Sequence, residues 1–215
     1  MPSKPRIALL HGFAVGLTSP FVRPGLGPTV GFRAFREDVA DGSARVFPWG
    51  SYRNVKLHEL VNPLFLYRHY LTERAMAFDR ATQKRLHDFF VELQPDIIVC
   101  HSMGSVLLHE YLAHFSLPNS VRAIVFVQSE LPTTTHLATK VPVYNIFCLW
   151  DLSLLASALV HWHWRVGLGA WKHPGVTNIF FPLFRVPNLH MSSMRSPKLR
   201  ELVLQILADT EKPRA

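Results

Sequence analysis

Short apolar segments recur along the chain, and longer stretches with helical periodicity separate them. The short segments are rich in Val, Ile and Phe and do not alternate with polar residues. That pattern is typical of strands covered on both faces in a parallel sheet. It predicts strands at 7–10, 44–47, 97–100, 123–127, 143–149 and 176–181.

The longer stretches place apolar residues three or four positions apart, as on one face of an amphipathic helix. This spacing is found at 86–93, 107–115 and 199–207. Strands that alternate with helices favour right-handed crossovers. The pattern therefore predicts an α/β fold with a doubly wound, mostly parallel sheet of about six strands.

Two segments depart from this alternation. Residues 13–31 are rich in Gly and Pro, which predicts a long loop, and residues 151–175 are apolar and aromatic. The loop and the start of 151–175 follow strands at the carboxyl edge of the sheet, where α/β proteins bind their ligands. We therefore expect a functional site at this edge.

Composition and charge narrow the class of protein. The chain has 215 residues, which suits a single domain spanning 1–215. Its residues are 48% hydrophobic and 18% charged, a composition that excludes a disordered chain. The formal net charge is +8, but Lys and Arg form no basic run, so nucleic-acid binding is not predicted. Loose attraction to anionic membranes or acidic partners fits this charge better.

The sequence carries no sign of secretion or of a membrane span. Its two cysteines, Cys100 and Cys148, are too few for a disulfide framework, and we interpret them as buried free thiols. The N-terminal sequence has no signal-peptide pattern, and no apolar stretch reaches the ~18 residues of a transmembrane helix. These observations predict a cytoplasmic location.

The sequence IIVCHSMGS at 97–105 runs from an apolar strand into a predicted helix, with Ser102 on the turn between them. Such a turn lifts a hydroxyl above the sheet. It also places the next N–H at a helix N-terminus, where negative charge is favoured. A serine nucleophile needs a base, and the base needs an orienting carboxylate.

Later strands end near residues that can supply both groups. Asp151 follows the strand in VPVYNIFCLW, and His190 lies in FRVPNLHMSSM, between the last strand and the last helix. Asp151 could instead cap the helix that follows it. Among the other histidines, His173 precedes the last strand, and His161 and His163 lie in the aromatic segment.

The order Ser, Asp, His, with HGF at 11–13 and HSMG at 101–104, resembles the α/β-hydrolase fold. The resemblance spans about residues 6–208. Because the chain starts at the ALLHG strand, it lacks the family's first two strands. In this it is similar to the small, minimal-core lipases and esterases.

The resemblance implies a role for each matching position. Ser102 would be the nucleophile, His190 the base, and Asp151 the acid that holds His190 in the useful tautomer. The backbone N–H groups of Phe13 and Met103 would form the oxyanion hole.

Cys100 departs from the family's pattern, which prefers glycine where strand and helix approach closely. We interpret Cys100 as a tolerated, buried variant that crowds the turn slightly. A reactive thiol is the alternative. His11 and His101 are interpreted as structural.

These features predict a serine hydrolase that cleaves carboxylic esters of apolar acyl groups through an acyl-serine intermediate. Phe21, Leu152 and Trp162 are candidate residues of the substrate pocket. No metal or organic cofactor is implied, because HWH at 161–163 would place its two imidazoles on different faces of a helix. The expected partner is a small-molecule ester.

Other functions fit the same residues. A thioesterase, an amidase and an acyltransferase use the same triad, and a binding protein can keep the fold without turnover. The segment 151–175 has a plain explanation as a core helix. Its Trp and basic residues instead favour a cap over an apolar pocket, suited to peripheral contact with a membrane or lipid.

Overall fold

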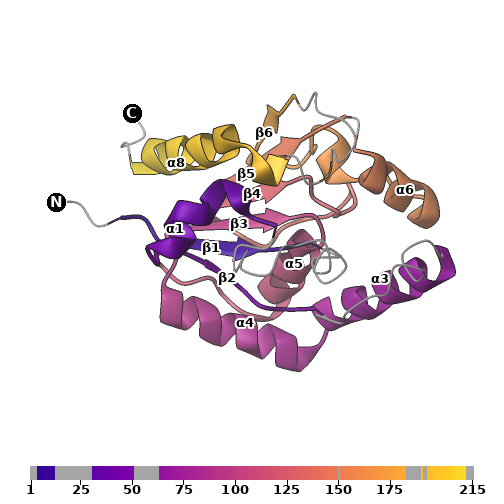
Figure 1. Cartoon of the computed structure of the whole chain (residues 1–215), viewed down its shortest axis with the longest axis horizontal. Coiled ribbons are helices and arrows are strands. Elements are labelled where there is room, and N and C mark those ends of the chain that lie inside the picture. Colours follow the sequence, from indigo (N-terminus) through magenta and orange to yellow (C-terminus); the bar gives the residue numbers. More distant parts are fainter. Residues whose placement is uncertain are drawn as a thin grey trace.

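The computed structural model describes residues 4–12, 31–50, 63–149, 151–182, 190 and 193–211. Its centre is a six-stranded sheet in the order β2-β1-β3-β4-β5-β6, with every neighbouring pair parallel (Figure 1). The strands are β1 Ile7–Leu10, β2 Ala44–Val46, β3 Ile97–His101, β4 Ala123–Val127, β5 Val143–Phe147 and β6 Val176–Phe180. The predicted doubly wound parallel sheet is confirmed, and the strand ends differ from the expected ones by a residue or two.

Helices cover both faces of this sheet. They are α1 Arg36–Ala40, α3 Pro63–Ala77, α4 Arg80–Leu93, α5 Gly104–His114, α6 Leu152–His161 and α8 Pro197–Glu211. α4 and α5 pack on one face, and α1 and α8 pack on the other (Figure 1). The three stretches with predicted helical periodicity fall in α4, α5 and α8.

The central strands are continuously apolar because successive side chains point to opposite faces of the sheet, and helices cover both faces. One face gathers Ala8, Leu10, Ile98, Cys100, Ile124 and Phe126 against α4 and α5. The opposite face gathers Ile7, Leu9, Ile97, Val99, Ala123 and Val125 against α8. The expectation of strands covered on both faces is wrong for β6, an edge strand whose side chains are all partly or fully exposed.

Two other segments differ from the sequence pattern or extend it. The pattern does not predict α3, because the apolar residues of this helix are spread around its circumference and form no single stripe. The aromatic segment 151–175 holds α6 and a short 3-10 turn at Val166–Leu168. The loop predicted at 13–31 lies outside the described residues, apart from Gly31.

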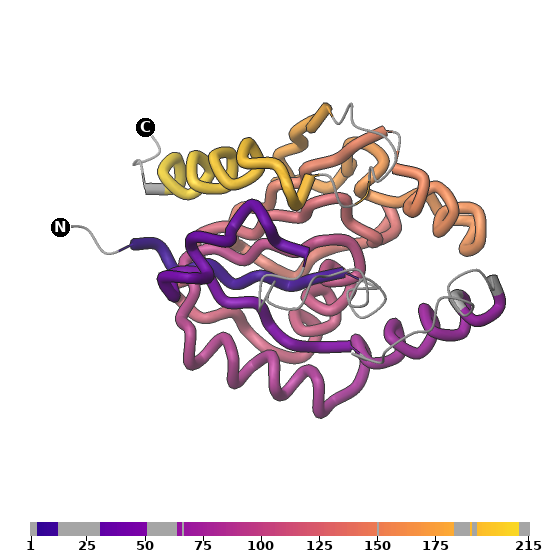
Figure 2. Tube along the Cα trace, in the orientation of Figure 1, coloured from indigo at the N-terminus to yellow at the C-terminus, as the bar shows by residue number. Residues whose placement is uncertain are grey.

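The ends of the sheet have different surroundings. β1 begins and α8 ends at one end of the molecule, while α3 and α6 extend beyond the strands at the other (Figure 2). Because all strands run in parallel, this second end is their carboxyl edge. It is the edge at which the sequence predicts the functional site.

Candidate active site

Ser102 occupies a sharp turn between β3 and α5. β3 ends at His101 and α5 begins at Gly104, so two residues reverse the chain direction. Ser102 has φ of 50°, in the left-handed region that non-glycine residues adopt only under constraint. Its N–H donates to the carbonyl of Val127 at 3.1 Å, which ties the turn to the end of β4.

Close packing at two glycines holds this turn against β1. A Cβ atom on Gly104 would lie 2.2 Å from the carbonyl oxygen of Leu10, a distance that no real side chain tolerates. A Cβ on Gly12 would lie 2.6 Å from the Cβ of Ser102. The start of α5 therefore meets the end of β1 without room for a side chain at either glycine.

Cys100 lies within the sheet, two residues before the serine. It pairs with Leu10 of β1 and Phe126 of β4 and is fully buried. Burial raises the pKa of its thiol well above the ordinary value, so the thiol stays protonated at neutral pH. The close approach that the motif requires occurs at Gly104 and Gly12, which leaves position 100 able to hold a small side chain.

Asp151 makes the hydrogen bonds of both alternatives that the sequence left open. Its Oδ1 accepts the N–H groups of Ser153 at 3.0 Å and Leu154 at 3.1 Å, so it caps the N-terminus of α6. Its Oδ2 lies 2.6 Å from Nδ1 of His190. A carboxylate oxygen only accepts, so Nδ1 of His190 carries the proton and donates it.

Four groups donate to this buried carboxylate: the N–H groups of Ser153 and Leu154, Nδ1 of His190 and a side-chain amide. Burial alone would raise the pKa of Asp151, but the hydrogen bond and charge of His190 and the N–H of Leu154 outweigh it and hold the pKa below its ordinary value. The fourth donor is the side-chain amide of Gln128, whose Nε2 lies 2.6 Å from Oδ2. Asp151 is therefore ionised at neutral pH.

Gln128 and Ser193 are site residues that the sequence analysis missed. Gln128 follows β4 with φ of 48°, and its Oε1 accepts a short hydrogen bond from the hydroxyl of Ser193, just before α8. Both residues are buried. Only one feature of the sequence pointed to Gln128: it is a polar residue directly after an apolar strand, at the edge where the site is predicted.

His101 links the serine turn to His190. Its Nε2 donates to the backbone carbonyl of His190 at 2.9 Å, and the two imidazole rings have centroids 4.7 Å apart. Burial, with the nearby charge of His190, lowers the pKa of His101 to about 3, so it stays neutral. His11 is also buried, stacks on Trp49 and has its pKa lowered by burial to about 4.

The structure brings some of the predicted site residues together and does not describe others. Asp151 and His190 are hydrogen-bonded, and Ser102 adjoins His101, which contacts His190. Within the described residues, no hydrogen bond joins the Ser102 side chain to His190. Phe13 and Phe21 lie outside the described residues.

The remaining predicted residues belong to helices at the site edge. Met103 is buried at the start of α5, and no hydrogen bond within the described part of the chain uses its N–H. Leu152 is 65% exposed and Trp162 is 90% exposed. Their role in a substrate pocket stays a prediction.

The described ranges contain no group of three or more His, Cys, Asp or Glu side chains that could hold a metal ion. Among those ranges, no helix has the length and apolar character needed to cross a bilayer.

Solved structures with the α/β-hydrolase fold resemble this chain. MenH from S. aureus matches with a TM-score of 0.53 at 9% identity, over 99% of this chain and 96% of that one. The dienelactone hydrolase from Anabaena variabilis matches with a TM-score of 0.45 at 16% identity, over 96% and 85%. No family model and no curated protein matches the sequence. The likeness to MenH, with the six-stranded parallel sheet, shows that the chain has the α/β-hydrolase fold.

Proposed function

We propose that the protein is a serine hydrolase that cleaves carboxylic esters of apolar acyl groups. The observation that supports this most is the 2.6 Å hydrogen bond between Oδ2 of Asp151 and Nδ1 of His190, beside the turn that holds Ser102. A buried carboxylate that fixes the tautomer of a histidine near a serine is the arrangement that activates a serine hydroxyl.

The proposed reaction begins with proton transfer. Because Nδ1 of His190 donates to Asp151, Nε2 of His190 is the basic nitrogen and takes the proton of the Ser102 hydroxyl. The Ser102 Oγ attacks the ester carbonyl carbon, and the N–H groups of Met103 and Phe13 stabilise the oxyanion. The tetrahedral intermediate expels the alcohol, which receives the proton from His190.

Water completes the cycle. His190 takes a proton from water, and the resulting hydroxide attacks the acyl-serine carbonyl. The intermediate then collapses, releases the carboxylic acid and returns the proton to Ser102. The ionised Asp151 stabilises the positive charge that His190 carries in both halves of the reaction.

The substrate is proposed to be apolar, because the helix that begins after Asp151 exposes apolar side chains at the site edge. Segment 151–175 is proposed to act as a cap, with Leu152 and Trp162 exposed at the mouth of the acyl pocket. A cytoplasmic location is part of the same proposal.

The decisive experiment is labelling with a fluorophosphonate probe, which reacts with activated serines. The parent chain should be labelled, and Ser102→Ala should not be. Ser105→Ala is the matched control, because Ser105 is a buried serine of α5 whose hydroxyl donates to the carbonyl of Ser102. Loss of labelling in Ser105→Ala but not in Ser102→Ala would overturn the assignment.

The labelled enzyme then needs a substrate screen. Ester, thioester and amide donors of matched acyl length separate the hydrolase classes that share a triad. We expect the ester to give the highest kcat/KM. A folded parent chain that neither reacts with the probe nor turns over any donor would favour a binding protein instead.

A further inference from the structure

Apolar side chains are exposed on the outer face of α6 and on the residues that follow it. In a water-exposed helix these positions are usually polar. Trp162, which ends α6 in a left-handed conformation, is the most exposed of them at 90%. The α6 face consists of Leu152, Leu159, Val160, Trp162 and Trp164.

A second apolar face lies on α3. Leu64, Tyr67 and Leu71 are exposed and spaced by three and four residues, so they share one side of the helix. Arg68, on the same side, is also exposed. We refer to these four residues as the α3 face.

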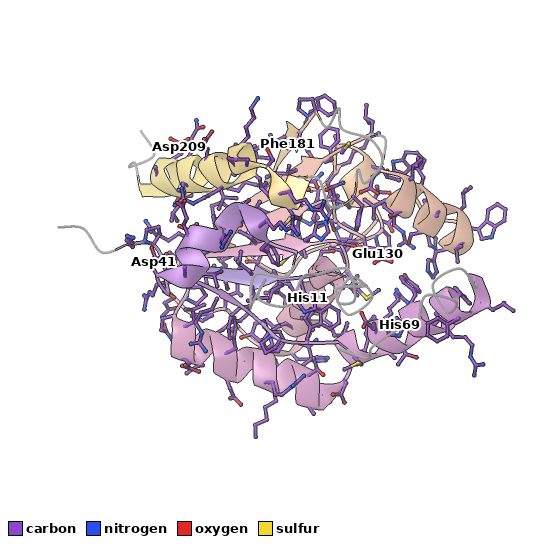
Figure 3. All side chains as sticks on the ribbon, in the orientation of Figure 1. His11, Asp41, His69, Glu130, Phe181 and Asp209 are labelled. Atoms are coloured by element: carbon purple, nitrogen blue, oxygen red, sulfur yellow. The ribbon has the colours of Figure 1, made fainter. Side chains whose placement is uncertain are left out.

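Partly buried polar contacts connect the two helices that carry these faces. The hydroxyl of Tyr70 on α3 donates a short hydrogen bond to the Glu130 carboxylate, and it lies 3.1 Å from Nε2 of His161 on α6. Ser157 of α6 donates to the same carboxylate at 3.2 Å. Figure 3 shows Glu130 at the carboxyl edge of the sheet, between α6 and α3. The two faces therefore belong to the same end of the molecule.

The acidic side chains of the segments that carry the two faces are buried, whereas basic side chains of α3 are at least partly exposed. Within 63–78 and 151–173, the acidic residues are Glu73 and Asp151, and both are buried. On α3, the basic residue Arg68 is exposed and Arg74 is partly exposed. After α3, the next exposed acid along the chain is Asp79, whose carboxylate caps the N-terminus of α4.

Exposed acids are found at the other end instead. Figure 3 shows Asp41 and Asp209 beside the start of β1 and the end of α8, far from α3 and α6. The chain as a whole has a formal net charge of +8. The exposed charge carried by α3 is therefore basic, which favours contact of the apolar end with an anionic surface.

We infer that the α6 face and the α3 face together dock on the headgroup region of an anionic lipid bilayer. Exposed tryptophan and leucine enter the interface, and Arg68 pairs with lipid phosphates. The purpose of docking rests on the proposed function, because it would bring the site edge to apolar esters held in the bilayer. The docking itself does not depend on catalysis.

Co-sedimentation with lipid vesicles tests this inference. The full chain carrying Ser102→Ala is mixed with vesicles of phosphatidylcholine alone or of phosphatidylcholine with phosphatidylglycerol. Ser102→Ala prevents turnover of the lipid during the measurement. We expect partition into the anionic vesicles to be about tenfold stronger, and to weaken at high salt, since basic side chains add attraction to anionic lipid.

Matched variants locate the docking surface. Leu64→Gln combined with Leu159→Gln alters side chains that are 73% and 74% exposed, so the fold should be kept. This pair should lower partition into anionic vesicles about tenfold or more, because two apolar side chains no longer enter the interface. The control is Val91→Gln, which alters a 51% exposed side chain on α4 and should leave partition unchanged.

The outcomes separate this inference from the proposed function. If the parent chain reacts with the fluorophosphonate probe but binds no vesicle, docking is wrong and the hydrolase proposal stands. If it binds vesicles but no serine reacts, docking stands without the hydrolase. If the paired variant abolishes self-association seen by light scattering and vesicles are not bound, the faces contact a second copy of the chain and the inference is overturned.

Discussion

Ser102 and Asp151 follow parallel strands of the same sheet, yet they are held in place by different interactions. Backbone packing positions Ser102, since its left-handed conformation is enforced by the glycines that let α5 meet β1. Side-chain hydrogen bonds position Asp151, which accepts from Gln128 and His190 as well as from the start of α6. The serine half of the site should therefore fail through steric strain, and the acid half through lost donors.

The largest effect should come from removing the proposed nucleophile or the proposed base. Ser102→Ala and His190→Ala should each lower kcat by about four to six orders of magnitude, and the double variant should be little worse, because the two residues act as a unit. Ester hydrolysis by the purified variants checks this. Additive losses would point to a different base, such as His101.

A steric change at the serine turn should have the next largest effect. Gly104→Ala should lower the free energy of unfolding by about 3 kcal/mol, because its Cβ would meet the Leu10 carbonyl oxygen. Gly169→Ala is the control, since its nearest neighbour lies at an ordinary 3.6 Å, and it should change stability by less than about 1 kcal/mol. Urea unfolding measures both, and equal values would contradict a close approach at Gly104.

The acid half should respond to the loss of one donor. Gln128→Met keeps the length of the side chain but removes the donor to Asp151. It should lower kcat/KM about 10- to 100-fold, since hydrogen bonds to charged groups contribute about 1.5–3 kcal/mol. Ser193→Ala should act in the same direction more weakly, because its hydroxyl reaches Asp151 only through Gln128.

A control separates positioning from general destabilisation. Asn145→Leu removes another buried amide, which donates to the Val166 and Gly169 carbonyls and not to Asp151. It should lower stability while leaving kcat largely intact. Ser193→Ala is also measured in the Gln128→Met background. If it lowers activity there by the same factor as in the parent chain, Ser193 does not act through Gln128.

This contrast explains which parts were predictable from the sequence. The strands and the serine turn follow from continuous apolar runs and from small residues at their ends, such as Gly104, so local pattern was sufficient. Gln128 and Ser193 lie 65 residues apart, and only tertiary packing brings them together. α3 was missed because its outer side chains are apolar, which removes the one-sided stripe by which a surface helix is recognised.

Acid should destabilise the packing around the serine turn. Burial lowers the pKa of His11 to about 4 and of His101 to about 3, while both have ordinary values near 6.5 in the unfolded chain. Between these values the unfolded state binds more protons, so stability is present above pH ~6.5 and falls as the pH drops. Each histidine should remove about 2 kcal/mol between pH 7 and pH 5.

Urea unfolding at the two pH values measures this loss. His11→Gln should roughly halve the pH dependence, because one of the two buried imidazoles no longer titrates. A parent chain equally stable at pH 7 and pH 5 would show that these histidines are not buried in their neutral forms.

The smallest effect is expected at Cys100, on the serine side of the comparison. Cys100→Gly restores the residue that the fold's motif prefers, and it should keep kcat within about twofold, because the thiol is fully buried in the core cluster against α4 and α5. It should lower the free energy of unfolding by about 1–2 kcal/mol through lost burial and a more flexible unfolded chain. Ester hydrolysis and urea unfolding of the same preparation separate the two effects. Complete loss of activity in a folded Cys100→Gly variant would give the thiol a chemical role, and the serine half would then depend on more than backbone packing.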